Sequence, residues 1–101
     1  MTGKQILIVE DEKPIRDMIA FGLRRAGYTV REAEDCREAR SQIADARPDL
    51  LLVDWMLPDR PGIELLREFR GQERTRALPV IMLTAKGSES DSVAGLDAGA
   101  D

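Results

Sequence analysis

Histidine is absent from this sequence of 101 residues, and cysteine occurs once, as Cys36. Without histidine the chain cannot form a Ser-His or Cys-His catalytic pair, a histidine metal site or a phosphohistidine. A single cysteine provides neither an internal disulfide nor a cysteine metal cage. The single cysteine, together with the lack of a signal peptide and of a membrane span, favours a protein of the cytoplasm, where thiols stay reduced.

The sequence also lacks long apolar runs and an excess of basic residues. No apolar segment approaches the ~20 residues that a membrane span needs, and the beginning of the chain has no signal-peptide pattern. We therefore expect no membrane partner. The formal net charge is −4, which argues against binding of DNA or RNA phosphates by this chain alone. A separate basic domain in the same protein is compatible with that charge.

What the sequence does contain is an alternation of short apolar segments and amphipathic segments. The apolar segments are continuous rather than alternating with polar residues, which is typical of strands that are buried on both faces. Turn residues and charged residues separate them from the segments with helical periodicity. The predicted strands cover residues 6–9, 29–33, 50–53 and 79–83.

Helices are predicted between these strands. Pro14 suits the first turn of one helix, and Gly27 ends it. Asp35 is expected to cap a second helix that stops before Pro48. A fourth helix is predicted to begin near Ser88. The expected apolar faces contain Ile15, Met18, Ile19 and Leu23 in the first helix, Ala39 and Ile43 in the second, and Ile63, Leu66 and Phe69 in the third.

This order of elements predicts an α/β domain with a parallel sheet covered on both faces. We expect one domain over residues 1–101, without internal repeats or an interdomain linker. Right-handed crossovers place the loops after the first, third and fourth strands at one edge of the sheet. Ligands of open α/β sheets bind at that edge, so the functional residues are expected there.

Three acidic residues follow predicted strands at that edge: Glu10 and Asp11 after the first strand, and Asp54 after the third. If those strands are neighbours, the three carboxylates lie close together and repel one another. A cation would stabilise such a cluster, and oxygen ligands favour Mg²⁺ or Mn²⁺. The alternative is that these are separate, solvated acids, which strand ends of α/β proteins often carry.

Other residues at the same edge are less specific. Thr84 ends the fourth strand, where its hydroxyl could donate a hydrogen bond to an anion, although threonine is common at strand ends. The small side chain of Ala85 leaves room for a phosphate-sized group. Pro58 and Gly62 are explained by ordinary turn chemistry.

Four segments resemble, in order, the motifs of response-regulator receiver domains of two-component systems. The DWMLP segment is most similar to the phosphate-regulon activator subfamily, whose regulators carry a winged-helix DNA-binding domain. The resemblance implies a flavodoxin-like (CheY-like) doubly wound parallel sheet, with strand order 2-1-3-4 for the strands present here. The matching segments are residues 6–12 (ILIVEDE), 54–58 (DWMLP) with Gly62, 79–85 (PVIMLTA) and 95–101 (GLDAGAD).

The resemblance also implies a role for each matching residue around the metal. Asp54 matches the phosphoacceptor, and Asp11 matches the acidic residue that ligates Mg²⁺ directly. Glu10 matches its neighbour, which acts through metal-bound water. Met56 matches the residue whose backbone carbonyl ligates the metal, so its side chain need not be polar.

Two further roles and one departure concern the end of the chain. Thr84 matches the switch hydroxyl, and Ala85 matches the residue whose amide contacts the phosphoryl group. The pocket lysine of the family, at the end of a fifth strand, has no match, because Lys86 follows Thr84 too closely. The fifth strand and fifth helix have no match either, so we expect the chain to be incomplete at its C-terminal end.

The resemblance implies a phosphorelay signalling domain rather than an enzyme. A phosphohistidine on a sensor histidine kinase would supply the phosphoryl group to Asp54, and phosphorylation would switch the conformation of the domain. The output would be a DNA-binding transcription-regulator domain that this chain does not contain. A homodimer of the full-length protein would form through the face built by helix four, strand five and helix five.

Alternatives from other classes stay open. A stand-alone receiver would act through protein contacts alone, and a pseudo-receiver would only bind partners. An aspartyl-phosphate phosphohydrolase of the haloacid-dehalogenase type would need Asp-x-Asp-x-Thr after the first strand, where this chain has Glu-Asp-Glu-Lys-Pro at 10–14. A flavodoxin-like FMN carrier would need a hydroxyl-rich phosphate loop at the same place.

Overall fold

The computed structural model describes residues 3–83, which form four strands and three helices. The predicted helix that begins near Ser88 lies outside these described residues. Each predicted strand is present, with its ends within one residue of the expected positions. The elements are β1 (Gln5–Val9), α1 (Lys13–Arg25), β2 (Thr29–Ala33), α2 (Cys36–Asp45), β3 (Leu50–Asp54), α3 (Gly62–Arg70) and β4 (Val80–Leu83).

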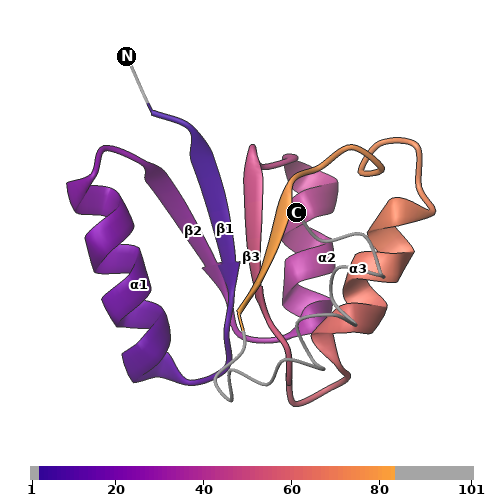
Figure 1. Ribbon diagram of the computed structural model, residues 1–101, viewed down its shortest axis with the longest axis horizontal. Coiled ribbons are helices and arrows are strands. Elements are labelled where there is room, and N and C mark those ends of the chain that lie inside the picture. Colours follow the sequence, from indigo (N-terminus) through magenta and orange to yellow (C-terminus); the bar gives the residue numbers. More distant parts are fainter. Residues whose placement is uncertain (1–2, 84–101) are drawn as a thin grey trace.

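The strands form one parallel sheet in the order β2-β1-β3-β4, which confirms the predicted topology. The order reverses between β1 and β3, the two central strands. Helix α1 covers one face of the sheet, and α2 and α3 cover the other (Figure 1). The loops after β1 and β3 therefore emerge side by side at a topological switch point, where α/β sheets bind ligands.

Local signals in the sequence define the ends of the first two helices as predicted. Pro14 lies in the first turn of α1, and Gly27, just beyond its end, has a φ of 100° that few other residues tolerate. The Asp35 side chain accepts a hydrogen bond of 2.8 Å from the Glu38 N–H and so caps α2. Helix α2 ends three residues before Pro48.

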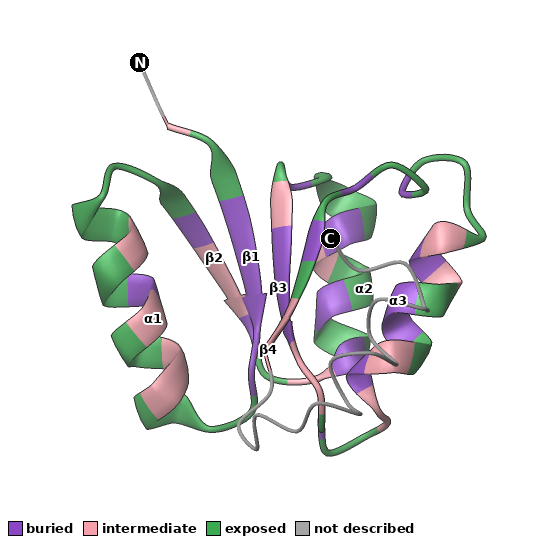
Figure 2. Cartoon of the chain, in the orientation of Figure 1, coloured by how far each residue is buried: buried purple, intermediate pink, exposed green. Residues whose placement is uncertain are grey.

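The core has two parts, one on each face of the sheet. Side chains that alternate along β1 and β3 enter opposite parts: Leu7 and Leu51 pack under α2 and α3, and Ile8 and Leu52 pack under α1. This explains why the strands are apolar throughout. Figure 2 shows buried residues along the strands and on the sheet-facing sides of α2 and α3, whereas α1 is mostly exposed or intermediate.

One residue of the predicted apolar face of α1, Met18, is exposed to solvent. Ile15, Ile19 and Leu23 are partly covered, but 67% of Met18 is exposed. Met18 instead lines an open groove beside Leu83, on the half of the sheet face that no described helix covers. None of the helices between residues 3 and 83 has the length and apolar character needed to cross a bilayer.

The contrast between the two faces predicts unequal costs of truncation. Leu65 of α3 is 0% exposed, so Leu65→Ala should lower the free energy of unfolding by about 2–5 kcal/mol through lost burial and a cavity. Met18→Ala, the control, should cost about 0.5 kcal/mol or less. Urea denaturation followed by circular dichroism measures both, and similar midpoints for the two variants would contradict this packing.

Candidate functional site

The two central strands bring the three predicted acidic residues together. Val9 of β1 lies opposite Val53 of β3, so Glu10 and Asp54 follow at the same edge. One carboxylate oxygen from each of Glu10, Asp11 and Asp54 lies within 4.8 Å of the other two. The convergence predicted from the sequence is therefore confirmed: the three acids are not separate, although Asp11 is exposed to solvent.

Glu10 is the most deeply buried member of the cluster, with 4% of its surface exposed. Burial raises the pKa of its carboxyl group, and the negative charges of Asp54 and Asp11 raise it further. A hydrogen bond of 2.9 Å from the Glu12 N–H to Glu10 Oε2 opposes this effect. This bond also fixes the direction of the Glu10 side chain.

Asp54 ends β3 and is partly buried. Burial raises the pKa of Asp54, and repulsion from the nearby charge of Asp11 adds to the rise. The backbone N–H groups of Trp55 and Met56 oppose this rise and lower the pKa of Asp54, because they favour its charged form. Asp11, the third member, is exposed.

The cluster fits a small divalent cation. Its donors are all carboxylate oxygens, which are the ligands that Mg²⁺ and Mn²⁺ prefer. Burial, and then repulsion within the cluster, raises the pKa values of Glu10 and Asp54, so a nearby cation would favour their charged forms. The exposed position of Asp11 leaves an open side where a bound ion would keep water molecules.

The loop after Asp54 returns closely to the strand that it leaves. The Trp55 N–H donates to the Leu83 carbonyl of β4 at 2.8 Å, and the Gly62 N–H donates to the Trp55 carbonyl at 2.8 Å. Met56 forms an isolated bridge with Pro61. The Met56 side chain is 58% exposed, so only its backbone is fixed by the fold.

Gly62 is more than the ordinary turn residue that the sequence predicted. A Cβ atom at this position would lie 2.1 Å from the Asp54 carbonyl oxygen and 2.9 Å from Val53 Cγ1. Glycine is therefore required so that the beginning of α3 can pack against the backbone of Asp54. Two signals were present in the sequence, the position of Gly62 directly after Pro61 and its place in the family motif, and neither reveals this close approach.

Asp59 is a second residue whose role the sequence did not reveal. Its carboxylate accepts hydrogen bonds of 3.0 Å from the N–H groups of Cys36 and Arg37, at the beginning of α2. These bonds anchor the middle of the loop that follows Asp54. Burial raises the pKa of the Cys36 thiol to about 11, so this only cysteine is an inert core residue rather than a nucleophile.

The remaining predicted site residues are at the end of the chain. Thr84, Ala85 and Lys86 lie outside the described residues, and so does the helix predicted to follow them. Their roles stay predictions. Strand β4 ends at Leu83, immediately before Thr84 and at the same edge of the sheet as Asp54.

Comparison with known proteins places most of the chain in one family. The response regulator receiver domain family matches residues 6–101. The phosphate regulon transcriptional regulatory protein PhoB of Pseudomonas aeruginosa is 54% identical over 101 residues, which are 100% of this chain and 44% of that protein. The chain thus spans less than half the length of the curated relatives it matches.

Solved structures of receiver domains have the same fold. A putative response regulator from Chloroflexus aurantiacus has a TM-score of 0.95 and 40% identity, covering 99% of this chain and 82% of its own. The chemotaxis response regulator CheY4 of Vibrio cholerae has a TM-score of 0.90 and 34% identity over 98% of this chain and 82% of its own. The Mn²⁺-bound form of response regulator Rcp1 has a TM-score of 0.87 and 26% identity over 97% of this chain and 77% of its own.

The close approach at Gly62 predicts a cost for the smallest possible side chain. Gly62→Ala should lower the free energy of unfolding by about 1–3 kcal/mol, because the new Cβ displaces the Asp54 backbone. Gly22→Ala is the control: it lies within α1 and its Cβ would have no neighbour within 4 Å, so it should stabilise by up to about 1 kcal/mol. Thermal unfolding measures both, and a Gly62→Ala protein as stable as the wild type would refute the argument.

The raised pKa values of Glu10 and Asp54 predict a pH-dependent effect of Asp54→Asn in metal-free buffer. Groups whose pKa is higher in the folded state favour folding below their unfolded pKa, near pH 4, and this contribution disappears as the pH rises through the folded values. Removing one of three charges should therefore raise the unfolding temperature at pH 7 and change it little at pH 3.5. Equal gains at both pH values would argue against repulsion as the cause.

Proposed function

Because the chain belongs to the response regulator receiver domain family, we propose that it accepts a phosphoryl group on Asp54 from a sensor histidine kinase. The single observation that supports this role best is the position of Asp54, partly buried at the switch point and within 4.8 Å of two further carboxylates. The domain is a signalling domain of two-component systems rather than a metabolic enzyme.

The chemistry proposed for Asp54 needs no general base. Its carboxylate is an oxygen nucleophile when ionised, so the lack of histidine is no obstacle. An Asp54 oxygen bonds to phosphorus as the phosphorus–nitrogen bond of the phosphohistidine breaks, and the released histidine nitrogen takes up a proton. Positioning and charge neutralisation dominate catalysis of this step. The backbone N–H groups of Trp55 and Met56 favour the ionised form of Asp54, which is the form that attacks.

The proposed metal site uses the same cluster. Asp11, Asp54 and the Met56 carbonyl would hold Mg²⁺ directly and Glu10 through water, with Mn²⁺ as a substitute; Rcp1, a relative, has a Mn²⁺-bound form. A bound Mg²⁺ would supply positive charge that offsets repulsion between the carboxylates and the incoming phosphoryl group. Thr84 and Ala85 are proposed to contact the phosphoryl group through the hydroxyl and the backbone amide.

The proposed output is control of transcription in the cytoplasm. The PhoB relative is a transcriptional regulatory protein more than twice the length of this chain, so DNA binding would belong to a domain beyond it. The net charge of −4 agrees with a receiver that does not itself bind DNA. Homodimerisation through helix four, strand five and helix five is part of this proposal. A stand-alone receiver that acts through protein contacts is the second candidate, since one structural neighbour, CheY4 of Vibrio cholerae, is a chemotaxis response regulator rather than a transcriptional one by name.

Phosphorylation of Asp54 is tested by labelling in the presence of Mg²⁺. Asp54→Asn should take up no acid-labile phosphate from acetyl phosphate or a phosphorylated kinase, because the nucleophilic oxygen is replaced by an amide. Asp49→Asn is the matched control at the opposite end of β3, where its carboxylate binds the Gln5 N–H at 2.7 Å, and it should label normally. Undiminished labelling of Asp54→Asn would reject the assignment. If a chelator that removes Mg²⁺ leaves labelling of the wild type unchanged, the proposed requirement for a metal ion is wrong.

The apolar side chain of Met56 is the basis for proposing a long-lived phosphoryl group; its exposure favours the alternative that it points to solvent and matters little. Hydrolysis requires a water aligned behind phosphorus. We propose that Met56, two residues after Asp54, flanks the approach of this water, which its apolar side chain cannot orient. Met56→Asn should speed phosphate release about tenfold, which corresponds to roughly 1.4 kcal/mol of the barrier. Met56→Leu, which keeps the apolar bulk, should leave the rate unchanged. Release rates of the purified phosphorylated proteins decide this, and an unchanged or slower Met56→Asn would contradict it.

A further inference from the structure

Arg16 of α1 is a charged residue that turns toward the sheet rather than toward solvent. Only 12% of its side chain is exposed. Its Nη1 atom donates to the Glu10 carbonyl at 2.7 Å, and its Nε atom donates to Glu32 Oε1 of β2 at 3.2 Å. Arg16 therefore joins the end of β1, where the acidic cluster begins, to the neighbouring strand.

We infer that Arg16 is a positioning residue, which holds Glu10 and Asp11 in the orientation that the metal site requires. The inference rests on the proposed function, because it concerns the same cluster. It assigns Arg16 no contact with the metal or the phosphoryl group. Its action is exerted through the backbone between Glu10 and Asp11.

The hydrogen-bond pattern explains why this backbone needs an external anchor. The Glu10 N–H makes the last bond to β2, at 3.0 Å from the Ala33 carbonyl, and the chain then leaves the sheet. The Glu10 carbonyl is the next hydrogen-bond acceptor along the chain, and it accepts a hydrogen bond from Arg16. This carbonyl belongs to the same planar peptide unit as the N–H and Cα atoms of Asp11. Fixing the orientation of the carbonyl therefore also fixes the position of the Asp11 Cα, from which the side chain extends.

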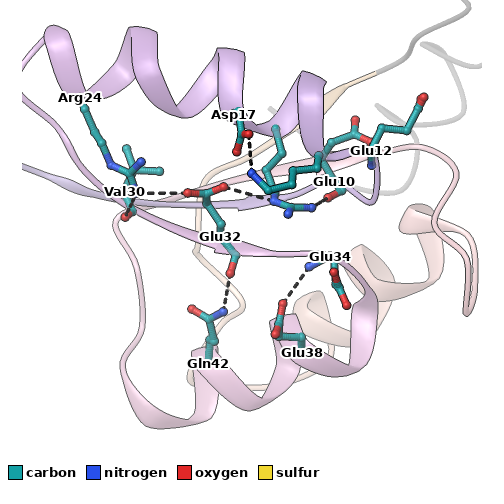
Figure 3. A network of polar contacts seen from close by, with 11 residues as sticks. Glu10, Glu12, Asp17, Arg24, Val30, Glu32, Glu34, Glu38 and Gln42 are labelled. Atoms are coloured by element: carbon teal, nitrogen blue, oxygen red, sulfur yellow. Dashed lines mark hydrogen bonds and ion pairs between the residues drawn. The ribbon is translucent and has the colours of Figure 1, made fainter.

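Glu32 in turn keeps Arg16 in place. Figure 3 shows Glu32 at the centre of the network, between Arg24 on one side and Glu10 on the other. The Glu32 backbone is paired with Ile8 of β1, and its carbonyl accepts 2.7 Å from Gln42 Nε2 of α2. The guanidinium thus contacts the side chain of a residue whose backbone is held by two neighbouring elements, β1 and α2. A charge-assisted pair with this little exposure is stronger than a surface ion pair.

Arg24 offers a matched control within the same network. It donates to Glu32 Oε2 at 3.2 Å and to the Val30 carbonyl at 3.0 Å, and its side chain is 52% exposed. Within residues 3–83, its hydrogen bonds go to these two partners and not to Glu10. Replacing Arg24 or Arg16 removes one ion pair to Glu32, but only the replacement of Arg16 frees the Glu10 carbonyl.

The experiment is a Mg²⁺ titration of the purified protein, followed by the fluorescence of Trp55, the only tryptophan, and independently by calorimetry. Arg16→Gln should bind Mg²⁺ about tenfold more weakly than the wild type, the range typical when a residue that orients a metal ligand is lost. Arg24→Gln should bind within about twofold of the wild type. Arg16→Lys keeps the charge but cannot donate to both partners as the guanidinium does. Its Mg²⁺ affinity should lie between those of the wild type and Arg16→Gln.

The outcomes separate this inference from the proposed function. If the wild type gives no Mg²⁺ response in either measurement, the proposed metal site fails and the inference fails with it. If the wild type responds and Arg16→Gln matches Arg24→Gln, Arg16 is merely structural and the inference alone is overturned. Unfolding temperatures of both variants check that each is folded during the titration. Should Arg16→Gln not fold, Arg16→Lys decides, and wild-type affinity in that variant would overturn the inference.

Discussion

Mutual repulsion of the Glu10, Asp11 and Asp54 carboxylates is the interaction to which the rest of this structure is adapted. Two unit charges at such a distance repel by roughly 3 kcal/mol at the effective dielectric constant of a protein surface. That is a large share of the ~5–15 kcal/mol by which a domain of this size is stable. The apolar strands β1 and β3, buried on both faces, provide the rigid support that keeps these charges at one edge.

The loops that carry the acids are anchored by contacts outside the cluster itself. Two sets of hydrogen bonds hold the loop after β3. The Gly62 N–H donates to the Trp55 carbonyl, and the Asp59 carboxylate accepts from two N–H groups in the first turn of α2. The loop after β1 is held by Arg16 on the Glu10 carbonyl. This arrangement leaves the carboxylate oxygens of Asp11 and Asp54 available to a cation and a phosphoryl group.

Most of the fold was predictable because short-range signals determine it. The continuous apolar segments 6–9 and 50–53 have no helical period, and Asp35 with Glu38 defines a helix start locally. The acidic edge followed from topology once β1 and β3 were neighbours. The roles of Gly62 and Arg16 depend on contacts with backbone carbonyl groups, those of Asp54 and Glu10. Such contacts appear only in the folded chain and cannot be read from the pattern of residue types. Met18 matched the helical period but is exposed, since periodicity reports a face and not what covers it.

The hydrogen bond between the Trp55 N–H and the Leu83 carbonyl, 2.8 Å long, links the loop after Asp54 to the end of β4. Phosphorylation of Asp54 would replace one negative charge by nearly two within a cluster that is already repulsive. The rigid anchors on Glu10, Asp59 and Gly62 oppose relaxation toward α1, α2 and α3. The Trp55 bond instead connects the residue after Asp54 to the end of β4, directly before Thr84. A change at Asp54 would therefore be coupled to Leu83 and so to Thr84, the residue that the family resemblance assigns as the switch.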